Sequence, residues 1–289
     1  MKEHEALSTR VGRLWVVATP IGNLEDLAPR AQRVLSEVDL VAAEDTRHTG
    51  RLLARLGLSR PLLSLHEHNE SARVAQILDR MRQGQDVALV SDAGTPLVSD
   101  PGFRLVRAVR QAGFDVFPIP GPSAAIAALS VAGLPSDRFW FEGFLPASGS
   151  ARKQRLEALL ALPVTVVCYE SSHRIRALAD DLAALAPDRE MALAREISKQ
   201  FEEHFFGAAG TLAAWLDEDV NRLRGEFVVV LGAHPEADRG EETAWTPEQE
   251  RLLRVLLDDL PLKQAVGLAS RLSGLPRNRV YARALEWAG

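Results

Sequence analysis

The stretch Ser91-Asp-Ala-Gly-Thr-Pro-Leu-Val-Ser-Asp-Pro-Gly102 joins the apolar run 87–91 to the segment Phe103–Ala112. The run has the length and composition of a buried strand, and the segment after the loop has the apolar spacing of a helix. Open α/β sheets bind ligands at the carboxyl ends of their strands, where this loop lies. Gly94 permits close approach of a ligand to the backbone, and neighbouring amides are free to bond it. On its own, the loop is equally consistent with a tight turn.

Similar strand and helix patterns alternate through the first half of the chain. Strands are predicted at Leu14–Ala18, Leu40–Ala43, Leu62–Leu65, Val87–Ser91 and Val116–Pro118, with helices at Arg47–Leu56, Ser71–Gln83 and Phe103–Ala112. This β-α-β alternation indicates a mostly parallel sheet covered by helices on both faces. The turn-forming run Pro118-Ile-Pro-Gly-Pro122 precedes an apolar helix with Ser123 as its cap. We therefore expect a first α/β domain over residues 14–120, after a disordered lead-in at 1–13.

The second half carries a second set of strands, and we assign residues 121–233 to a second α/β domain. These strands are predicted at Phe139–Gly143, Val164–Tyr169, Met191–Arg195, Glu202–Gly207 and Glu226–Leu231. The runs 204–207 and 226–230 look like neighbours in one sheet. Cys168 lies inside an apolar run, which favours a buried structural thiol over a nucleophile.

The end of the chain differs in kind from the rest. A polar stretch, His234–Thr243, precedes three predicted helices within residues 245–289, an arrangement that resembles a helix-turn-helix module. Between Lys263 and Arg283 this module carries five cations and no acidic residue. On charge alone, contact with phosphate and a merely solvated helix face are equally good interpretations.

The composition excludes several classes of protein. No stretch approaches the ~20 apolar residues of a membrane span, and residues 1–13 lack the apolar core of a secretory signal. One cysteine excludes an internal disulfide and any multi-cysteine metal site, so we expect a cytoplasmic protein without a metal. The net charge of −5 argues against nucleic-acid binding through the overall field, while local basic patches remain compatible with RNA.

Unusual polar clusters follow several of the predicted strands, and as a set they resemble one family closely. The motifs are Val17-Ala-Thr-Pro-Ile-Gly-Asn-Leu24, Ala43-Glu-Asp-Thr-Arg47, Val90-Ser-Asp-Ala-Gly-Thr-Pro-Leu-Val-Ser-Asp-Pro-Gly102, Pro120-Gly-Pro-Ser-Ala124, Phe141-Glu-Gly-Phe-Leu-Pro146, Tyr169-Glu-Ser-Ser-His-Arg174 and Arg195-Glu-Ile-Ser-Lys199. They are similar to those of the ribosomal RNA small subunit methyltransferase I family in the tetrapyrrole-methylase superfamily. The resemblance covers roughly residues 14–232, in order.

The resemblance implies a two-domain tetrapyrrole-methylase fold, class III among S-adenosylmethionine-dependent methyltransferases, acting as a homodimer. It implies methyl transfer to the ribose 2′-oxygen of a cytidine in the decoding centre of 16S ribosomal RNA, free or in the assembled subunit. Carried over by position, the donor S-adenosylmethionine would be held by Pro20, Asp92, Ala93, Gly94, Thr95, Pro96, Val98, Ser123, Ala124, Tyr169, Arg195, Gly225 and Glu226.

Transfer to a ribose hydroxyl requires loss of a proton, and a positioned base can accept it. The candidates are His66, His68, Asp45 and Glu170. Three of them have a structural alternative: the two histidines can bond backbone at a strand end, and Asp45 can pair with Arg47 across its loop. No single base emerges from the sequence.

RNA contacts are predicted at basic residues beside the cleft that the resemblance implies between the two α/β domains, and in the helical module at 245–289. A mobile basic loop after residues 147–150 is favoured over an exposed helix start, because three cations at a helix N-terminus oppose its dipole. Lys199 is either a phosphate ligand or a solvated lysine. The predicted RNA-binding set is Arg47, Arg152, Lys153, Arg155, Arg174, Lys199, Lys263, Arg277 and Arg279.

Two other functions fit parts of the sequence. A small-molecule methyltransferase acting on a porphyrin-like substrate would share the fold and the donor site, although the motifs at 19–23 and 43–47 favour the RNA branch. A non-enzymatic RNA-binding protein would use the α/β part as a scaffold, and a scaffold has no need of polar loops at strand ends.

Overall fold

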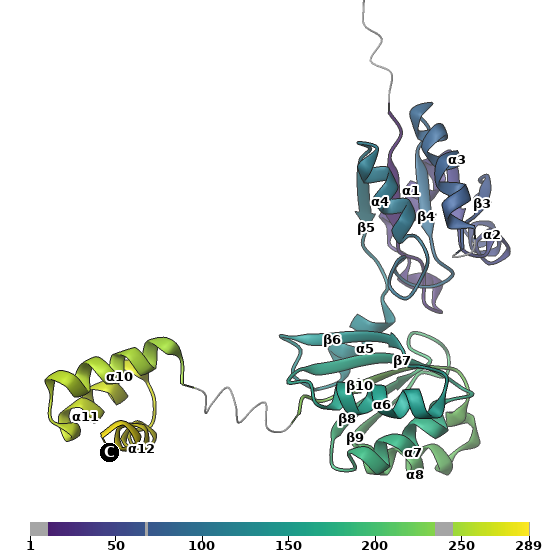
Figure 1. The fold of residues 1–289 in the computed structure, drawn as a ribbon. Coiled ribbons are helices and arrows are strands. Elements are labelled where there is room, and N and C mark those ends of the chain that lie inside the picture. Colours follow the sequence, from purple (N-terminus) through teal and green to yellow (C-terminus); the bar gives the residue numbers. More distant parts are fainter. Residues whose placement is uncertain (1–10, 67–68, 235–244, 289) are drawn as a thin grey trace, which may run out of the picture. The chain divides into compact units, whose positions relative to one another are not determined.

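A computed structural model describes residues 11–66, 69–234 and 245–288 of the chain. The described residues fall into two compact units, one ending at His234 and one starting at Trp245 (Figure 1). Most of the predicted lead-in 1–13 and of the predicted linker 234–243 lies outside the described residues, as does His68. None of the helices in the described part is long and apolar enough to cross a membrane.

The first sheet contains five parallel strands in the order β3-β2-β4-β1-β5. The strands are β1 (Leu14–Val17), β2 (Leu40–Ala43), β3 (Leu62–Ser64), β4 (Val87–Val90) and β5 (Val116–Ile119). Alternate side chains of each strand point to opposite faces. One face packs against α1 (Pro29–Glu37) and α2 (Thr46–Arg55), and the other against α3 (Glu70–Arg82) and α4 (Phe103–Gln111). The prediction of a parallel sheet covered on both faces is confirmed.

The order of strands in this sheet brings the polar loops together. β1 pairs with both β4 and β5, and β4 also pairs with β2, so the carboxyl ends of β1, β2 and β4 are adjacent. Thr19 and Gly94 form an isolated bridge between two of these loops, with N···O distances of 2.9 and 3.1 Å. The edge of the sheet thus gathers motifs that are far apart in the sequence.

The second sheet is mixed and has the order β6-β7-β10-β8-β9. Its strands are β6 (Phe139–Phe144), β7 (Thr165–Ser171), β8 (Glu190–Arg195), β9 (Glu203–Ala208) and β10 (Glu226–Leu231). Only β6 and β7 run parallel. The prediction that the last two strands are neighbours is wrong, because β8 lies between them. The short connection 196–202 lets β8 and β9 pair as antiparallel neighbours, and β10 then enters between β7 and β8.

Helices cover both faces of the second sheet as well (Figure 1). α5 (Ala124–Val131) packs on one face, and α6 (Gly149–Leu160), α7 (Ile175–Leu185) and α8 (Leu212–Glu218) pack on the other. Cys168 is buried in the cluster formed with α6–α8. Burial raises the pKa of its thiol to about 12, so the thiolate is not populated near neutral pH and the residue is structural.

The prediction of a mobile basic loop after residue 150 is wrong, since helix α6 begins at Gly149. Arg152 points inward from this helix, where its Nε and Nη2 each lie 2.7 Å from Oδ2 of Asp181 on α7. Both side chains are more than nine-tenths buried. Lys153 remains exposed and lies 3.4 Å from Asp181 Oδ1. An internal partner, rather than RNA, thus explains the first cation of this helix.

Removing the acidic partner of the buried pair is expected to destabilise the fold. In Asp181→Ala the Arg152 charge stays buried without compensation, so we expect the free energy of unfolding in urea to fall by about 3–5 kcal/mol. Asp180→Ala is the matched control, because Asp180 is exposed and pairs with Arg176 only at the surface. That control should cost no more than about 1 kcal/mol. Equal losses in the two variants would contradict the structural role of the pair.

The second unit consists of α10 (Pro247–Asp259), α11 (Leu262–Ser273) and α12 (Arg277–Ala288) around a small core that includes Leu253 and Val280. A reciprocal capping box between Thr246 and Gln249 starts α10. Gly274 adopts the left-handed conformation that ends α11. The predicted three-helix module is present.

Candidate functional site

The first unit contains a cavity of about 530 Å³, within the range of small-molecule sites. It is lined from the first sheet by the loops after β1, β2 and β4, and from the second by β7, β10, the start of α5 and the loop after β8. The lining residues are Ile21, Glu44, Asp92, Ala93, Gly94, Thr95, Val98, Ser99, Asp100, Ser123, Ala124, Phe144, Tyr169, Glu170, Ser171, Ser172, Ile197, Lys199, Gly225, Glu226, Phe227 and Val228.

The loop after β4 forms one wall and is held by its own hydrogen bonds. The Asp92 carboxylate accepts a bond of 3.1 Å from the backbone N–H of Asp45, and the Thr95 hydroxyl donates one of 3.0 Å to Pro122 O. Gly94 has a φ of +79°, a conformation that glycine adopts at little cost. Leu97 and Ser99 also have positive φ values, so the loop is strained where it borders the cavity.

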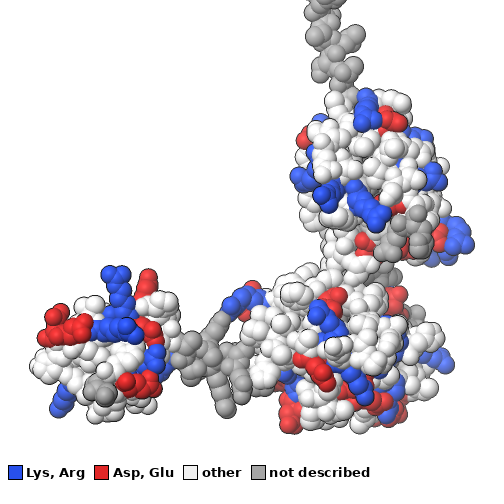
Figure 2. Space-filling model, viewed as in Figure 1, with Lys and Arg blue, Asp and Glu red and all other residues white. Residues whose placement is uncertain are grey.

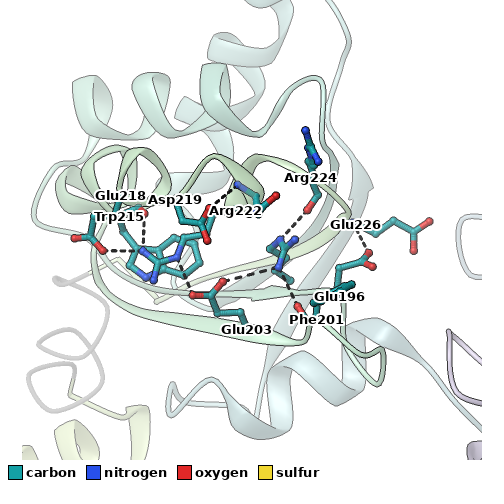
Figure 3. A network of polar contacts seen from close by, with 11 residues as sticks. Glu196, Phe201, Glu203, Trp215, Glu218, Asp219, Arg222, Arg224 and Glu226 are labelled. Atoms are coloured by element: carbon teal, nitrogen blue, oxygen red, sulfur yellow. Dashed lines mark hydrogen bonds and ion pairs between the residues drawn. The ribbon is translucent and has the colours of Figure 1, made fainter.

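The opposite rim is formed by the loop after β8 and the turn into β10. Glu196 Oε1 accepts from the Glu226 N–H at 2.9 Å, and Lys199 Nζ lies 2.9 Å from Glu196 Oε1 and 2.8 Å from Glu226 Oε2. Figure 3 shows Glu196 beside Glu226 at one end of a longer polar network. A Cβ at Gly225 would lie 2.6 Å from Cγ of Glu196, so only glycine fits there.

The network continues away from the cavity and fixes this rim. Arg195 donates to Arg224 O at 2.7 Å and to Phe201 O at 2.9 Å. Arg222 donates to Glu203 at 2.7 Å, as drawn in Figure 3. Contacts within the protein therefore hold the rim in a defined shape.

The lining carries more acidic than basic side chains, although Glu170 Oε1 also pairs with Arg174 Nε at 3.1 Å. Carboxylates of Glu44, Asp92, Asp100, Glu170 and Glu226 border the cavity, and Lys199 is the one cation among the lining residues of the described chain. That lysine is already paired with two glutamates. A cavity of this kind favours a ligand that carries positive charge.

The predicted donor-site residues divide into two groups. Ten of them line the cavity, namely Asp92, Ala93, Gly94, Thr95, Val98, Ser123, Ala124, Tyr169, Gly225 and Glu226. Pro20, Pro96 and Arg195 do not line it. Arg195 lies behind the rim, where its guanidinium bonds the carbonyl just before Gly225. It positions the turn rather than facing the cavity.

Of the base candidates, one borders the cavity. Glu170 is buried there; its Oε1 accepts from the Ser171 N–H at 2.8 Å, and its Oε2 has no hydrogen-bond partner within the described residues. His66 lies outside the lining, with its Nε2 3.0 Å from Asn69 Nδ2. Asp45 forms the pair with Arg47 that the sequence offered as its structural role, since Arg47 donates to both of its carboxylate oxygens. These bonds hold the pKa of Asp45 well below its usual range, which makes it a poor base.

One acidic residue that the sequence analysis did not single out stands in the cavity wall. Burial raises the pKa of Asp100, and the nearby Asp92 charge adds to the rise, while a hydrogen bond with the Ser91 side chain opposes it. A carboxyl group in a cleft with a raised pKa is a typical general-base environment. The signal in the sequence is its place in the Ser91–Gly102 loop, which also supplies predicted donor-site residues.

The predicted RNA-binding cations occupy different surroundings. Arg155 forms two bonds of 2.6 Å with Glu142. Arg174 donates to Leu145 O at 2.7 Å and pairs with Glu170 Oε1 at 3.1 Å. Arg47 is highly exposed although bonded to Asp45. In the second unit Lys263 and Arg277 are exposed and Arg279 is half-buried. Both charge signs are interspersed on the faces of the molecule seen in Figure 2, so no single-sign field covers them.

Comparison with known proteins places the chain in a family. Residues 13–213 match the Tetrapyrrole (Corrin/Porphyrin) Methylases, and residues 243–288 match the RsmI C-terminal HTH domain. The fold is shared with a crystal structure of uroporphyrin-III C-methyl transferase from Thermus thermophilus complexed with S-adenyl homocysteine. The TM-score is 0.53 at 21% identity, covering 79% of this chain and 99% of that one.

Closer relatives share the whole length of the chain. Ribosomal RNA small subunit methyltransferase I of Escherichia coli O157:H7 is 47% identical over 100% of both chains. The protein of the same name from Pseudomonas aeruginosa is 50% identical over 96% of this chain and 98% of its own. Similarity of this extent, together with the cavity at the junction of the ordered motifs, shows that the chain belongs to the ribosomal RNA small subunit methyltransferase I family of the tetrapyrrole methylases.

Proposed function

We propose that the protein transfers the methyl group of S-adenosylmethionine to the ribose 2′-oxygen of a cytidine in the decoding centre of 16S ribosomal RNA. The observation that carries this proposal is a donor-sized acidic cavity in a chain whose full-length relatives are named as small-subunit rRNA methyltransferases. The relatives support RNA as the acceptor, and the negative lining supports a cationic donor.

The residues around the cavity fit S-adenosylmethionine, whose sulfonium supplies an electrophilic methyl group. The carboxylates of Asp92 and Glu170 tolerate positive charge beside them. Ser123 and Ala124 border the cavity at the start of α5, where backbone N–H groups lack helical partners and can donate hydrogen bonds to the carboxylate of S-adenosylmethionine. Gly94 leaves room for close approach of the adenosine or the methionine part. The task of this wall is orientation of the reacting atoms.

The acceptor hydroxyl needs a proton acceptor beside the methyl group, and we assign this role to Asp100. It borders the cavity in a half-buried position, and its raised pKa makes it a stronger base than an ordinary aspartate. Glu170 lies deeper, and its unbonded Oε2 is better placed to orient the donor or the ribose than to exchange protons with solvent.

The assembly that we propose is a cytoplasmic homodimer. Apolar side chains stand exposed on one face of the second sheet, with Ile126 and Val131 on α5 and Phe206 on β9 each more than half exposed. Val131 and Phe206 border the same shallow hollow. An apolar surface of this kind is typical of a protein contact, and a second copy of the chain would cover it.

The decisive experiment follows labelled methyl groups. With labelled S-adenosylmethionine we expect incorporation into small-subunit RNA, either protein-free or in assembled subunits, and mapping should place the label on a ribose of a decoding-centre cytidine. Binding of the donor should be measured in parallel by calorimetry. Label on a base, or no label in any RNA-containing sample despite donor binding, would rule out ribose methylation. Transfer to a porphyrin-like substrate instead would assign the protein to the small-molecule branch.

A further inference from the structure

The second unit contains an open groove of about 520 Å³ between α11 and the start of α12. Its lining includes Lys263 and Arg271 on α11 and Arg277 at the start of α12, and no carboxylate. Lys263 and Arg271 are eight residues apart and lie on one face of α11, about 12 Å from each other at the helical rise per residue. Lys263 and Arg271 thus border the two ends of the groove along α11, and Arg277 borders it from the start of α12.

These cations differ from the other arginines of the unit. Lys263, Arg271 and Arg277 are exposed, and their side chains form no ion pair or hydrogen bond within the described residues. Arg283, by contrast, bonds Glu286 at 2.6 Å and also pairs with Glu250. The positive charge of the groove is therefore free to meet an anionic partner.

The middle of the groove is kept open by a glycine. Gly267 lies halfway between Lys263 and Arg271 on the same face, and a Cβ there would meet nothing within 4 Å. Glycine inside a helix lowers its stability relative to alanine, and neither packing nor a positive φ requires it at this position. The fold therefore does not require glycine at position 267, and its effect is to leave the surface of α11 open between Lys263 and Arg271.

The chemistry of the lining points to backbone rather than base contacts. The remaining lining residues are Gln264, Leu268 and Ser270, so the groove offers no aromatic ring for a base to stack on. The Ser270 hydroxyl is also occupied, because it donates to Leu275 O at 2.7 Å. Unpaired cations beside an open strip of helix suit the phosphates of a nucleic-acid strand, which carry no sequence information.

We propose that this groove binds the phosphate backbone of the substrate RNA through Lys263, Arg271 and Arg277, across the open surface at Gly267. The proposal rests on the proposed function, since it takes small-subunit RNA as the partner. The second unit then supplies sequence-independent affinity, and the choice of nucleotide is left to the first unit. Arg279, which is half-buried, contributes less than the three groove cations.

The test uses the full chain and protein-free small-subunit RNA, with binding measured over a range of salt concentrations. The triple variant Lys263→Ala, Arg271→Ala, Arg277→Ala should bind at least tenfold more weakly at low salt. The slope of log affinity against log salt should become shallower by about two, because each lost phosphate contact removes a little under one unit. Gly267→Leu keeps all three charges, and its Cβ would meet nothing within 4 Å. It should also weaken binding because its side chain extends into the groove, with an unchanged circular dichroism spectrum as the check on folding.

Arg251→Ala is the matched control, since Arg251 is an exposed cation of the same unit outside the groove lining. It should leave both affinity and salt slope near those of the wild type. S-adenosylmethionine binding should be unchanged in every variant. A wild-type protein that binds neither donor nor RNA contradicts the proposed function itself. Normal binding of protein-free RNA by the groove variants would overturn the groove proposal while leaving the proposed function intact. A loss of binding to assembled subunits but not to protein-free RNA would also overturn it, because the groove would then contact a ribosomal protein.

Discussion

The Asp100→Asn variant is expected to lose between about 10²- and 10⁴-fold in kcat for methyl transfer, the range by which a general base contributes. Asparagine keeps the shape of the side chain but cannot accept the proton of the ribose hydroxyl. Donor affinity should fall far less than kcat, because the amide keeps the shape of the cavity wall and the other acidic lining residues remain. Single-turnover transfer of labelled methyl to small-subunit RNA measures the loss, and calorimetry with S-adenosylmethionine measures donor binding.

The pH dependence gives an independent readout of the same role. Burial raises the pKa of Asp100, and the base must be ionised to act. The rate for the wild type should therefore rise with pH through this raised pKa, with an acid limb at higher pH than an ordinary aspartate near 3.9 would give. Asp100→Asn should lack that limb. Because the fold favours the neutral form of this residue, the substitution should not lower the melting temperature at neutral pH.

Two outcomes would count against Asp100 as the base. One is an Asp100→Asn enzyme that keeps near-normal kcat while Glu170→Gln loses activity, which would transfer the role to the deeper carboxylate. The other is a variant whose kcat falls only because donor affinity has collapsed. That result would make Asp100 a donor-binding residue.

The Gly94→Val variant is expected to lose at least 100-fold in S-adenosylmethionine affinity. Its φ of +79° is unfavourable for a β-branched residue, so the loop must shift. A Cβ added at Gly94 would also lie 3.4 Å from Ile21 Cγ2 and 3.7 Å from Pro122 O. The larger side chain thus disturbs a wall that both sheets share. Calorimetric titration of the folded variant with donor measures the effect.

Gly113→Val separates the effect on the site from general backbone strain. Gly113 has a φ of +82°, almost the same as that of Gly94, and a Cβ there would meet nothing within 4 Å. It lies after α4 and outside the cavity lining. Both variants should lose similar stability, and only Gly94→Val should lose donor binding. Equal donor affinities in the two would mean that the loop after β4 is only a turn.

Local patterns along the chain were sufficient for most of the elements, and the family resemblance added part of the cavity wall. The alternation of apolar runs and helical segments is a local property, and it predicted the first parallel sheet and the three final helices. The loop 91–102 follows a strand in the sequence, so its place at a sheet edge needed no further information. Carried over by resemblance, ten of the thirteen predicted donor-site positions line one cavity.

The tertiary structure alone decided properties that depend on partners distant in the sequence. The order of strands in the second sheet follows from which edges remain free to pair, and this placed β8 between β9 and β10. The sequence predicted Arg152 as an exposed cation, whereas the fold packs it against Asp181 of another helix. The basicity of Asp100 depends on its burial and on Asp92, both consequences of how the loop folds back. The sequence by itself determined that polar loops end the parallel strands at one edge of the sheet. Only the strand order and the packing decided which of these loops meet and which of their charges are paired.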